Sequence, residues 1–159
     1  MKELTYLYEN SLRACEIAGQ NLELEPKARR QQFSYIQSEV EELSEALDET
    51  NLVEELDACM DILVTTFGYL AKLQNLGARV DVAMVKTADN NLSKFPTTLE
   101  EVQQTQEFYK AVKNKETVFG YNPEYKRYVV RDMNGKYLKP SSFVENDLSD
   151  CFDDVKYDA

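Results

Sequence analysis

Histidine is absent from this chain of 159 residues. Its absence excludes Ser-His-Asp and Cys-His nucleophile systems, zinc sites with histidine ligands, and the Glu-x-x-His pairs of di-iron bundles. Any chemistry carried out by the chain therefore uses carboxylates, lysines, tyrosines, water and metal ions.

Cysteines and long apolar runs are also scarce. Cys15, Cys59 and Cys151 are odd in number and form no Cys-x-x-Cys pair, which is typical of a reducing cytoplasm and argues against a zinc or disulfide framework. The longest apolar stretch, residues 62–71, is roughly half of what spans a bilayer. Charged residues in the first helical turns argue against a signal peptide. We expect a cytoplasmic protein with no membrane partner.

Basic residues are outnumbered, with 18 Lys and Arg against 29 Asp and Glu and a formal charge of −11. A protein that binds nucleic acid needs clustered basic residues to replace counterions, so no nucleic-acid polymer is expected as a partner. A chain this acidic handles phosphates with the help of cations.

Apolar periodicity predicts four helices in the first part of the chain, which we expect to form one helical core over residues 1–96. Asn51 is the expected cap of the third helix, and Gly77 follows its end. The four helices are expected over residues 4–19, 27–48, 52–75 and 78–93.

Residues 97–144 are expected to extend the same domain. Thr98 and Glu101 predict a capping box at the start of a helix that ends near Lys113. Residues 125–130 and 136–139 are expected to pair as a β-hairpin across a turn at 132–135. Residues 145–159 read as a loosely held acidic tail.

Two acidic clusters occur on consecutive predicted helices. Glu39 and Glu42 are neighbours at i and i+3 and flank the apolar stripe of the second helix, whereas Glu41 and Glu45 lie further round, toward solvent. On the third helix, an arc of about 60° contains three acids, and the same face continues one and two turns later with small and apolar residues. The acids of that arc are Glu54, Asp57 and Asp61.

A helix whose acidic face becomes apolar is expected to be buried on both sides, with its acids pointing into the protein. Converging carboxylates need compensation, and Mg²⁺ or Mn²⁺ is the usual remedy. The alternative interpretation is that both clusters are ordinary solvated helix faces, with Glu54 serving only as a capping residue.

These segments resemble the MazG-like all-α nucleotide pyrophosphohydrolases, whose signature is ExxE followed by ExxD. The matching residues are Glu39-Val-Glu-Glu-Leu-Ser-Glu-Ala and Glu54-Glu-Leu-Asp-Ala-Cys-Met-Asp-Ile-Leu-Val. The resemblance is greatest to the phosphoribosyl-ATP pyrophosphohydrolase-like proteins often encoded by phages, which would place this chain in a host cytoplasm. It extends to Asn91-Leu-Ser-Lys94 and to Gly135-Lys-Tyr-Leu-Lys-Pro140.

The resemblance implies an all-α fold with a four-helix bundle core and a short C-terminal extension that contains the β-hairpin. It also implies a site with two or more Mg²⁺ ions, Mn²⁺ being an alternative. Glu39 and Glu42 match the first pair of the signature and include the residue that orients or deprotonates water. The second pair is either Asp57 with Asp61, which we favour with Glu54 as an outer ligand, or Glu54 with Asp57, because Ala58 stands three residues before Asp61.

The resemblance further implies hydrolysis of a nucleoside triphosphate between its α and β phosphates, giving a monophosphate and pyrophosphate for control of the nucleotide pool. Asn91, Lys94, Lys136 and Lys139 are the expected phosphate ligands, and Phe33 or Tyr35 contributes either to a base pocket or to the core. Relatives pair as homodimers or homotetramers. The alternative function is a non-catalytic interaction module or a nucleotide-binding regulator; the base and sugar stay open.

Overall fold

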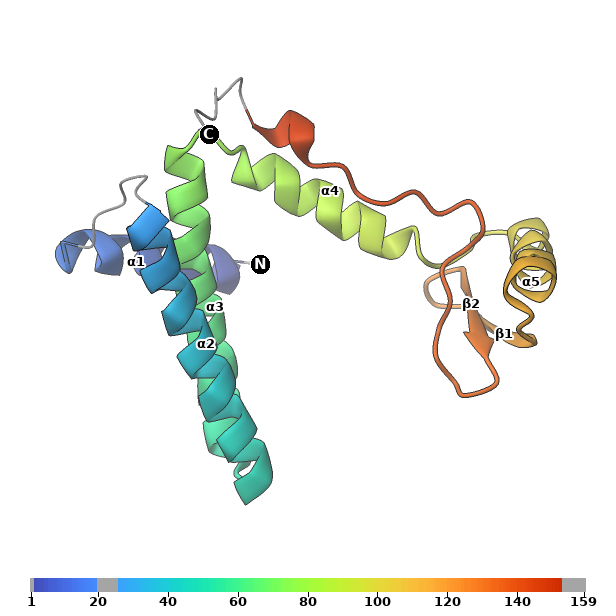
Figure 1. Ribbon diagram of the computed structural model, residues 1–159, viewed down its shortest axis with the longest axis horizontal. Coiled ribbons are helices and arrows are strands. Elements are labelled where there is room, and N and C mark those ends of the chain that lie inside the picture. Colours follow the sequence, from blue (N-terminus) through green and yellow to red (C-terminus); the bar gives the residue numbers. More distant parts are fainter. Residues whose placement is uncertain (1, 20–25, 153–159) are drawn as a thin grey trace. The chain divides into compact units, whose positions relative to one another are not determined.

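The computed structural model of the chain describes residues 2–19 and 26–152 (Figure 1). The structure is mostly helical and contains a small two-stranded antiparallel sheet, which confirms the expected helical class with a C-terminal β-hairpin. The described residues fall into two compact units. Unit 1 comprises those up to residue 80 together with 150–152, and unit 2 comprises residues 81–149.

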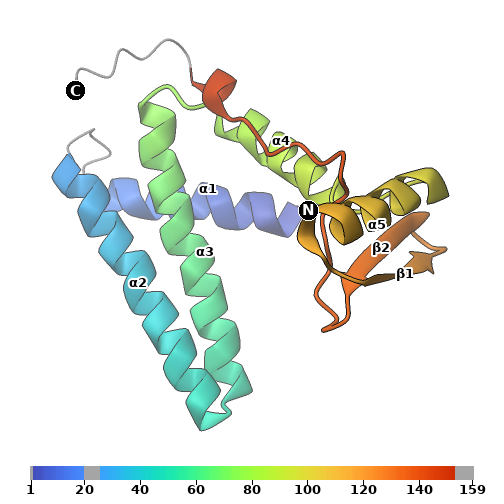
Figure 2. The same ribbon diagram turned by 45° about the vertical axis from the view of Figure 1, so that its right-hand side comes forward.

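Unit 1 contains α1 (Lys2–Ile17), α2 (Pro26–Glu49) and α3 (Leu52–Asn75). Helices α2 and α3 run antiparallel and side by side, and α1 packs on α3 (Figures 1 and 2). These three helices pair within one chain, and the four-helix bundle stays a prediction. The expected break at 21–25 lies outside the described residues.

Local chemistry sets the ends of α2 and α3. Pro26 opens α2, where its fixed φ suits the first helical position and its missing N–H costs nothing. The side chain of Asn51 accepts a hydrogen bond from the backbone N–H of Glu54 at 3.4 Å, which confirms Asn51 as the cap of α3. Beyond α3, Gly77 has a φ of 88°, the left-handed conformation that glycine adopts at helix ends.

Small and polar side chains, rather than the apolar stripes, bring α2 and α3 together. Gln32, Ala46 and Ala58 are buried, and Gly68 lies directly against the amide of Gln32. Part of each apolar stripe stays exposed in the single chain, whereas Phe67, further along the stripe of α3, is buried.

Exposure of these stripes contradicts one expectation. Val40 on α2 is 50% exposed, and Leu52 and Leu56 on α3 are 74% and 62% exposed. The expectation that α3 is buried on both sides is therefore wrong for the single chain. Its inner face holds Ala58 and Gly68 against α2, and Phe67 packs edge-on against Tyr8 of α1.

Unit 2 is built on α4 (Val80–Leu92, which begins at the last residue of unit 1), α5 (Leu99–Lys113), β1 (Thr117–Asn122) and β2 (Arg127–Asp132). The capping box of α5 is confirmed, because Thr98 and Glu101 exchange both expected hydrogen bonds. Helix α5 packs on the two strands around a small core. Its buried residues are Val102, Val130 and Leu138, with Tyr109 and Tyr128 packed against them.

The predicted hairpin is wrong in its partner strand. The strand β2 pairs along its length with β1, which precedes it, whereas the segment 136–139 contributes only an isolated bridge between Arg131 and Tyr137. Tyr125 lies in the turn between β1 and β2, where the side chain of Asn122 accepts hydrogen bonds from two backbone N–H groups. That turn makes β1 the long partner.

Residues 145–152 are held in place, so the expectation of a loose tail is wrong for them. Lys86 of α4 donates to the carbonyl of Asp147 at 2.6 Å, and Asn146 donates to Thr87 at 3.0 Å. Further on, Cys151 is 1% exposed and its carbonyl accepts from the backbone N–H of Arg79 at 2.7 Å. The rest of the predicted tail, from residue 153, lies outside the described residues.

Across residues 2–19 and 26–152, none of the helices has the length and apolar character needed to cross a membrane.

Candidate active site

All five predicted metal ligands lie on the α2–α3 pair of unit 1. Glu39 and Asp61 are half-buried, whereas Glu42, Asp57 and Glu54 are exposed. Glu41 and Glu45 are exposed, as expected. The acids therefore line an accessible edge of the contact between the two helices.

The register of α2 and α3 places Glu39 opposite Asp61. Gln32 lies against Gly68, and its side-chain amide donates to the carbonyl of Thr65 at 2.9 Å. In an antiparallel pair, equal steps toward the turn keep residues opposite one another. Seven residues, or about two helical turns, lead from Gln32 to Glu39 and from Gly68 to Asp61.

The pKa of Glu39 reflects its acidic surroundings. It is raised above its ordinary value of 4.5, first because burial disfavours the charged carboxylate, and then because of the negative charges of Glu42, Asp61 and Asp57. Two of these three acids belong to the facing helix. Its own partner Glu42 and both acids of the favoured second pair thus act on the half-buried carboxylate of Glu39.

The donor set suits a hard divalent cation, since it consists of carboxylate oxygens from two facing helices. In the part of the chain that the structure describes, no three acidic or cysteine side chains stand close enough to hold one ion. A metal held by Glu39, Glu42, Asp57 and Asp61 would therefore require their side chains to adopt other rotamers. The mutual repulsion at Glu39 is what a cation would relieve.

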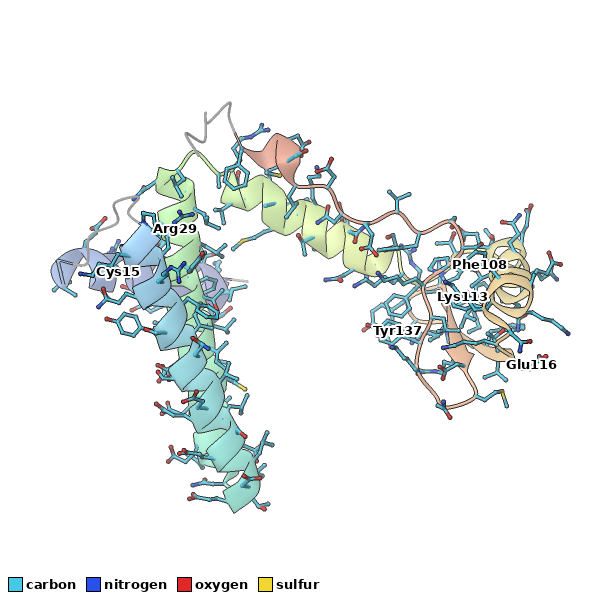
Figure 3. The ribbon with its side chains drawn as sticks, viewed as in Figure 1. Cys15, Arg29, Phe108, Lys113, Glu116 and Tyr137 are labelled. Carbon is cyan, nitrogen blue, oxygen red and sulfur yellow. The ribbon has the colours of Figure 1, made fainter. Side chains whose placement is uncertain are left out.

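A cavity of about 330 Å³ lies beside the first turns of α2. Phe33, predicted either for a base pocket or for the core, lines this cavity together with Arg29, Arg30 and Tyr69. Arg29, labelled in Figure 3, has a buried Nε without a hydrogen-bond partner among the described atoms. Tyr35, the other predicted base contact, instead accepts a hydrogen bond from Gln31 at 2.9 Å.

The two arginines of this cavity did not emerge from the sequence. Their signal is an Arg-Arg pair followed by Phe33 three and four residues later, which places all three side chains on neighbouring parts of the helix surface. Cationic side chains beside aromatic rings suit a phosphorylated aromatic compound.

The predicted phosphate ligands all belong to unit 2. The Nζ of Lys94 donates to the side-chain oxygen of Asn91 at 2.6 Å. Lys94, Lys136 and Lys139 line one cavity, so the structure brings these three predicted lysines together. Lys113 and Lys115, which line the same cavity, were missed. Their signal is a Lys-x-Lys pair at the end of α5 in an otherwise acidic chain.

Comparisons with protein-family profiles, with characterised proteins and with solved structures found no match for this chain.

Proposed function

We propose that this chain is a Mg²⁺-dependent nucleoside triphosphate pyrophosphohydrolase of the MazG-like type, releasing a nucleoside monophosphate and pyrophosphate. The observation that carries the proposal is the register of α2 and α3, which places the half-buried Glu39 opposite the half-buried Asp61. The raised pKa of Glu39, caused first by burial and then by Glu42, Asp61 and Asp57, supports it. The residues of the ExxE–ExxD resemblance, which lie on two different helices, thus act together at one carboxylate.

Within this proposal, Asp57 and Asp61 hold the cation together with the Glu39–Glu42 pair, and Glu54 is an outer ligand. Glu39 or Glu42 orients the attacking water and accepts its proton, a role that a carboxylate with a raised pKa favours. When bound, magnesium supplies positive charge to the phosphate chain and to the attacking water. Asn91, Lys94, Lys136 and Lys139, the expected phosphate ligands, belong to unit 2 and are not part of this proposed cation site.

Pyrophosphate release from a panel of nucleoside triphosphates, measured with Mg²⁺ and with EDTA, tests the activity. Asp61→Asn and Glu42→Gln are expected to lower turnover on the order of 100-fold or more, because each removes a charge from the cation site. Glu45→Gln, on the exposed side of α2, serves as the matched control and is expected to retain turnover.

Full activity of Asp61→Asn would refute the assignment of the site. Silence of the wild-type protein across the whole panel would refute the enzyme. If a divalent cation and a nucleotide then raised the melting temperature together, the alternative of a nucleotide-binding regulator would be preferred.

The proposed enzyme is a homodimer or homotetramer. Its α2–α3 pair exposes Phe33, Val40 and Leu47 at 53%, 50% and 57%, and an apolar stripe of this length is usually covered in a stable protein. Leu47→Glu is expected to shift the mass measured by sizing chromatography with light scattering toward that of a monomer. A monomeric wild-type protein would contradict this part of the proposal.

A further inference from the structure

Five lysines line one cavity of about 440 Å³ within unit 2. They come from three separate segments: the end of α4 and its following turn, the end of α5, and the segment after β2. The cavity is lined by Lys94, Tyr109, Lys113, Lys115, Lys136, Tyr137, Leu138 and Lys139.

Much of this positive charge has no counter-charge. Lys115 lies 3.9 Å from Asp132, and Lys139 lies 2.6 Å from Glu145 and over the ring of Phe143. Lys94 contacts the neutral side chain of Asn91. Within the described part of the chain, Lys113 and Lys136 have no acidic partner at ion-pair distance. Three positive charges are thus left over in a protein whose total charge is −11.

The carboxylate of Asp132 serves mainly its own turn, and of the five lysines it lies at ion-pair distance only from Lys115. It is 9% exposed and accepts hydrogen bonds from the backbone N–H groups of Asn134 and Lys136, both at 3.0 Å. These contacts shape the turn that presents Lys136. Asp132 therefore shapes this turn and offsets the charge of one lysine, Lys115.

The lysines also stand on a fixed framework. The backbone N–H of Tyr128 donates to the carbonyl of Pro96 at 2.8 Å, which holds the segment after Lys94 to β2. Leu138 donates to Val130 at 2.8 Å, so the segment of Lys136 is held to the same strand. Because these segments are fixed by β2, binding an anion does not require the framework to form first.

Two tyrosines add an aromatic surface to the cavity. Tyr137 is 48% exposed and packs on one side against Phe95, with the ring centroids 5.7 Å apart. Tyr137 and Lys113, which lie on different segments, are labelled in Figure 3. A supported but exposed ring is suited to stacking on a nucleobase.

The helix dipole of α5 accounts for part of the positive charge around the pocket. Lys110 and Lys113 lie in the last turn of α5, where the helix dipole favours cations. The dipole does not explain Lys94 and Lys136, which come from other segments. Nor does it explain why all five lysines border one cavity.

We propose that this lysine pocket binds the polyphosphate chain of a nucleotide and does so without a divalent cation. Several ammonium groups from different segments match the several anionic oxygens of a di- or triphosphate, and the cavity volume falls within the usual range of small-molecule sites. A nucleic-acid polymer is disfavoured, because the acidic remainder of the chain repels an extended phosphate backbone. The pocket is independent of the α2–α3 acids, so the proposal stands or falls separately from the pyrophosphohydrolase activity.

Calorimetric titration of the full chain in EDTA tests the pocket, with tripolyphosphate in one arm and ATP in the other. The double variant Lys113→Gln/Lys136→Gln is expected to weaken binding of both by at least about tenfold, because it removes two charged hydrogen-bond donors. The matched control Lys27→Gln/Lys110→Gln removes the same charge outside the pocket and is expected to bind as the wild-type protein does.

The variant Tyr137→Ala distinguishes a nucleotide from an inorganic polyphosphate as the ligand of the pocket. It is expected to weaken binding of ATP several-fold and to leave tripolyphosphate unchanged. Equal loss for both ligands, or equal wild-type affinity for both, would overturn the nucleotide and leave an inorganic polyphosphate as the ligand.

Four results would overturn the pocket itself: no binding by the wild-type protein in EDTA, unchanged binding by the lysine double variant, equal weakening in the control, or tighter binding of a single-stranded oligonucleotide than of ATP. Asp61→Asn is expected to bind as the wild-type protein does in EDTA. Its binding therefore shows whether a loss belongs to the pocket or to the α2–α3 site.

Discussion

A β-carbon added to Gly68 would lie 2.7 Å from the Nε2 atom of Gln32 on the facing helix. Gln32 is 4% exposed, so the buried amide occupies the space that any larger residue at position 68 would need. This contact sets how closely α2 and α3 approach near the acidic cluster. We therefore expect the two residues to be energetically coupled.

A double-mutant cycle on this pair is expected to show that coupling. In the wild-type background, Gly68→Ala displaces the Gln32 amide from the Thr65 carbonyl, and the loss of about 1 kcal/mol cancels most of the gain in helix propensity. In a Gln32→Ala background the same substitution is expected to stabilise by about 1 kcal/mol. Urea denaturation measures both differences, and equal effects of Gly68→Ala in the two backgrounds would contradict the coupling.

Glu39→Gln is expected to raise the melting temperature near pH 7 in EDTA, by on the order of 2 °C. The pKa of Glu39 is raised in the folded state, so the stability that protonation provides is complete below the ordinary value of 4.5 and is lost as the pH rises through the folded pKa. At neutral pH the charged carboxylate opposes folding, and glutamine removes that charge.

Thermal melts over a pH series measure this effect, and the difference between Glu39→Gln and the wild-type protein is expected to disappear in acid. Glu41→Gln on the exposed side of α2 is the control, with little change at any pH. A lower melting temperature for Glu39→Gln at neutral pH would show that the side chain is stabilising there.

Glu101→Gln, in contrast to Glu39→Gln, is expected to destabilise the folded protein, by about 1 kcal/mol near pH 7. The pKa of Glu101 is lowered, first by the backbone N–H of Thr97, 2.7 Å away, and further by the Thr97 hydroxyl and by the N–H of Thr98. Its stabilisation is therefore present above its ordinary pKa of 4.5 and is lost as the pH falls through the lower folded value.

Denaturation curves at neutral and acidic pH check this prediction, because the difference from the wild-type protein shrinks in acid. Glu107→Gln, exposed on the same helix, is the control. A loss of stability that did not change with pH would mean that the charge of Glu101 contributes nothing.

Val130→Ala is expected to destabilise unit 2 by about 2 kcal/mol, because Val130 is 1% exposed and its removal leaves a cavity beside Val102 and Leu138. Val118→Ala on the neighbouring strand, where the valine is 50% exposed, is expected to cost much less. Hydrogen exchange of the β2 and α5 amides measures the effect locally. Equal protection in the two variants would argue against this core.

The sequence predicted the features that depend on a few neighbouring residues. The caps at Asn51 and Thr98 were found because a capping residue acts only on the next helical turn. A spacing of three or four likewise predicts that Glu39 and Glu42 share a face of α2 and that Asp57 and Asp61 share a face of α3. Such signals need no knowledge of the tertiary structure.

Features that depend on contacts between distant segments could not be predicted in this way. The segment Arg127–Asp132 is flanked by turn signals on both sides, Asn122-Pro123 before it and Asn134-Gly135 after it, and local chemistry does not choose between the two possible partners. An apolar stripe in the sequence also does not indicate whether the same chain covers it: Val40 belongs to such a stripe and is half exposed. The lysine pocket draws on three segments and becomes visible only when β2 holds them together.

The hydrogen bond between Arg79 and Cys151 determines how a shortened version of the protein can be designed. It joins the points at which the chain leaves unit 1 and returns to it, so residues 81–149 form an insertion whose two ends lie within a backbone hydrogen bond of each other. A short glycine-containing turn could bridge those ends and yield the three helices as a separate polypeptide. Simple truncation after residue 80 would instead remove the strand-like contact between Ala78 and Phe152.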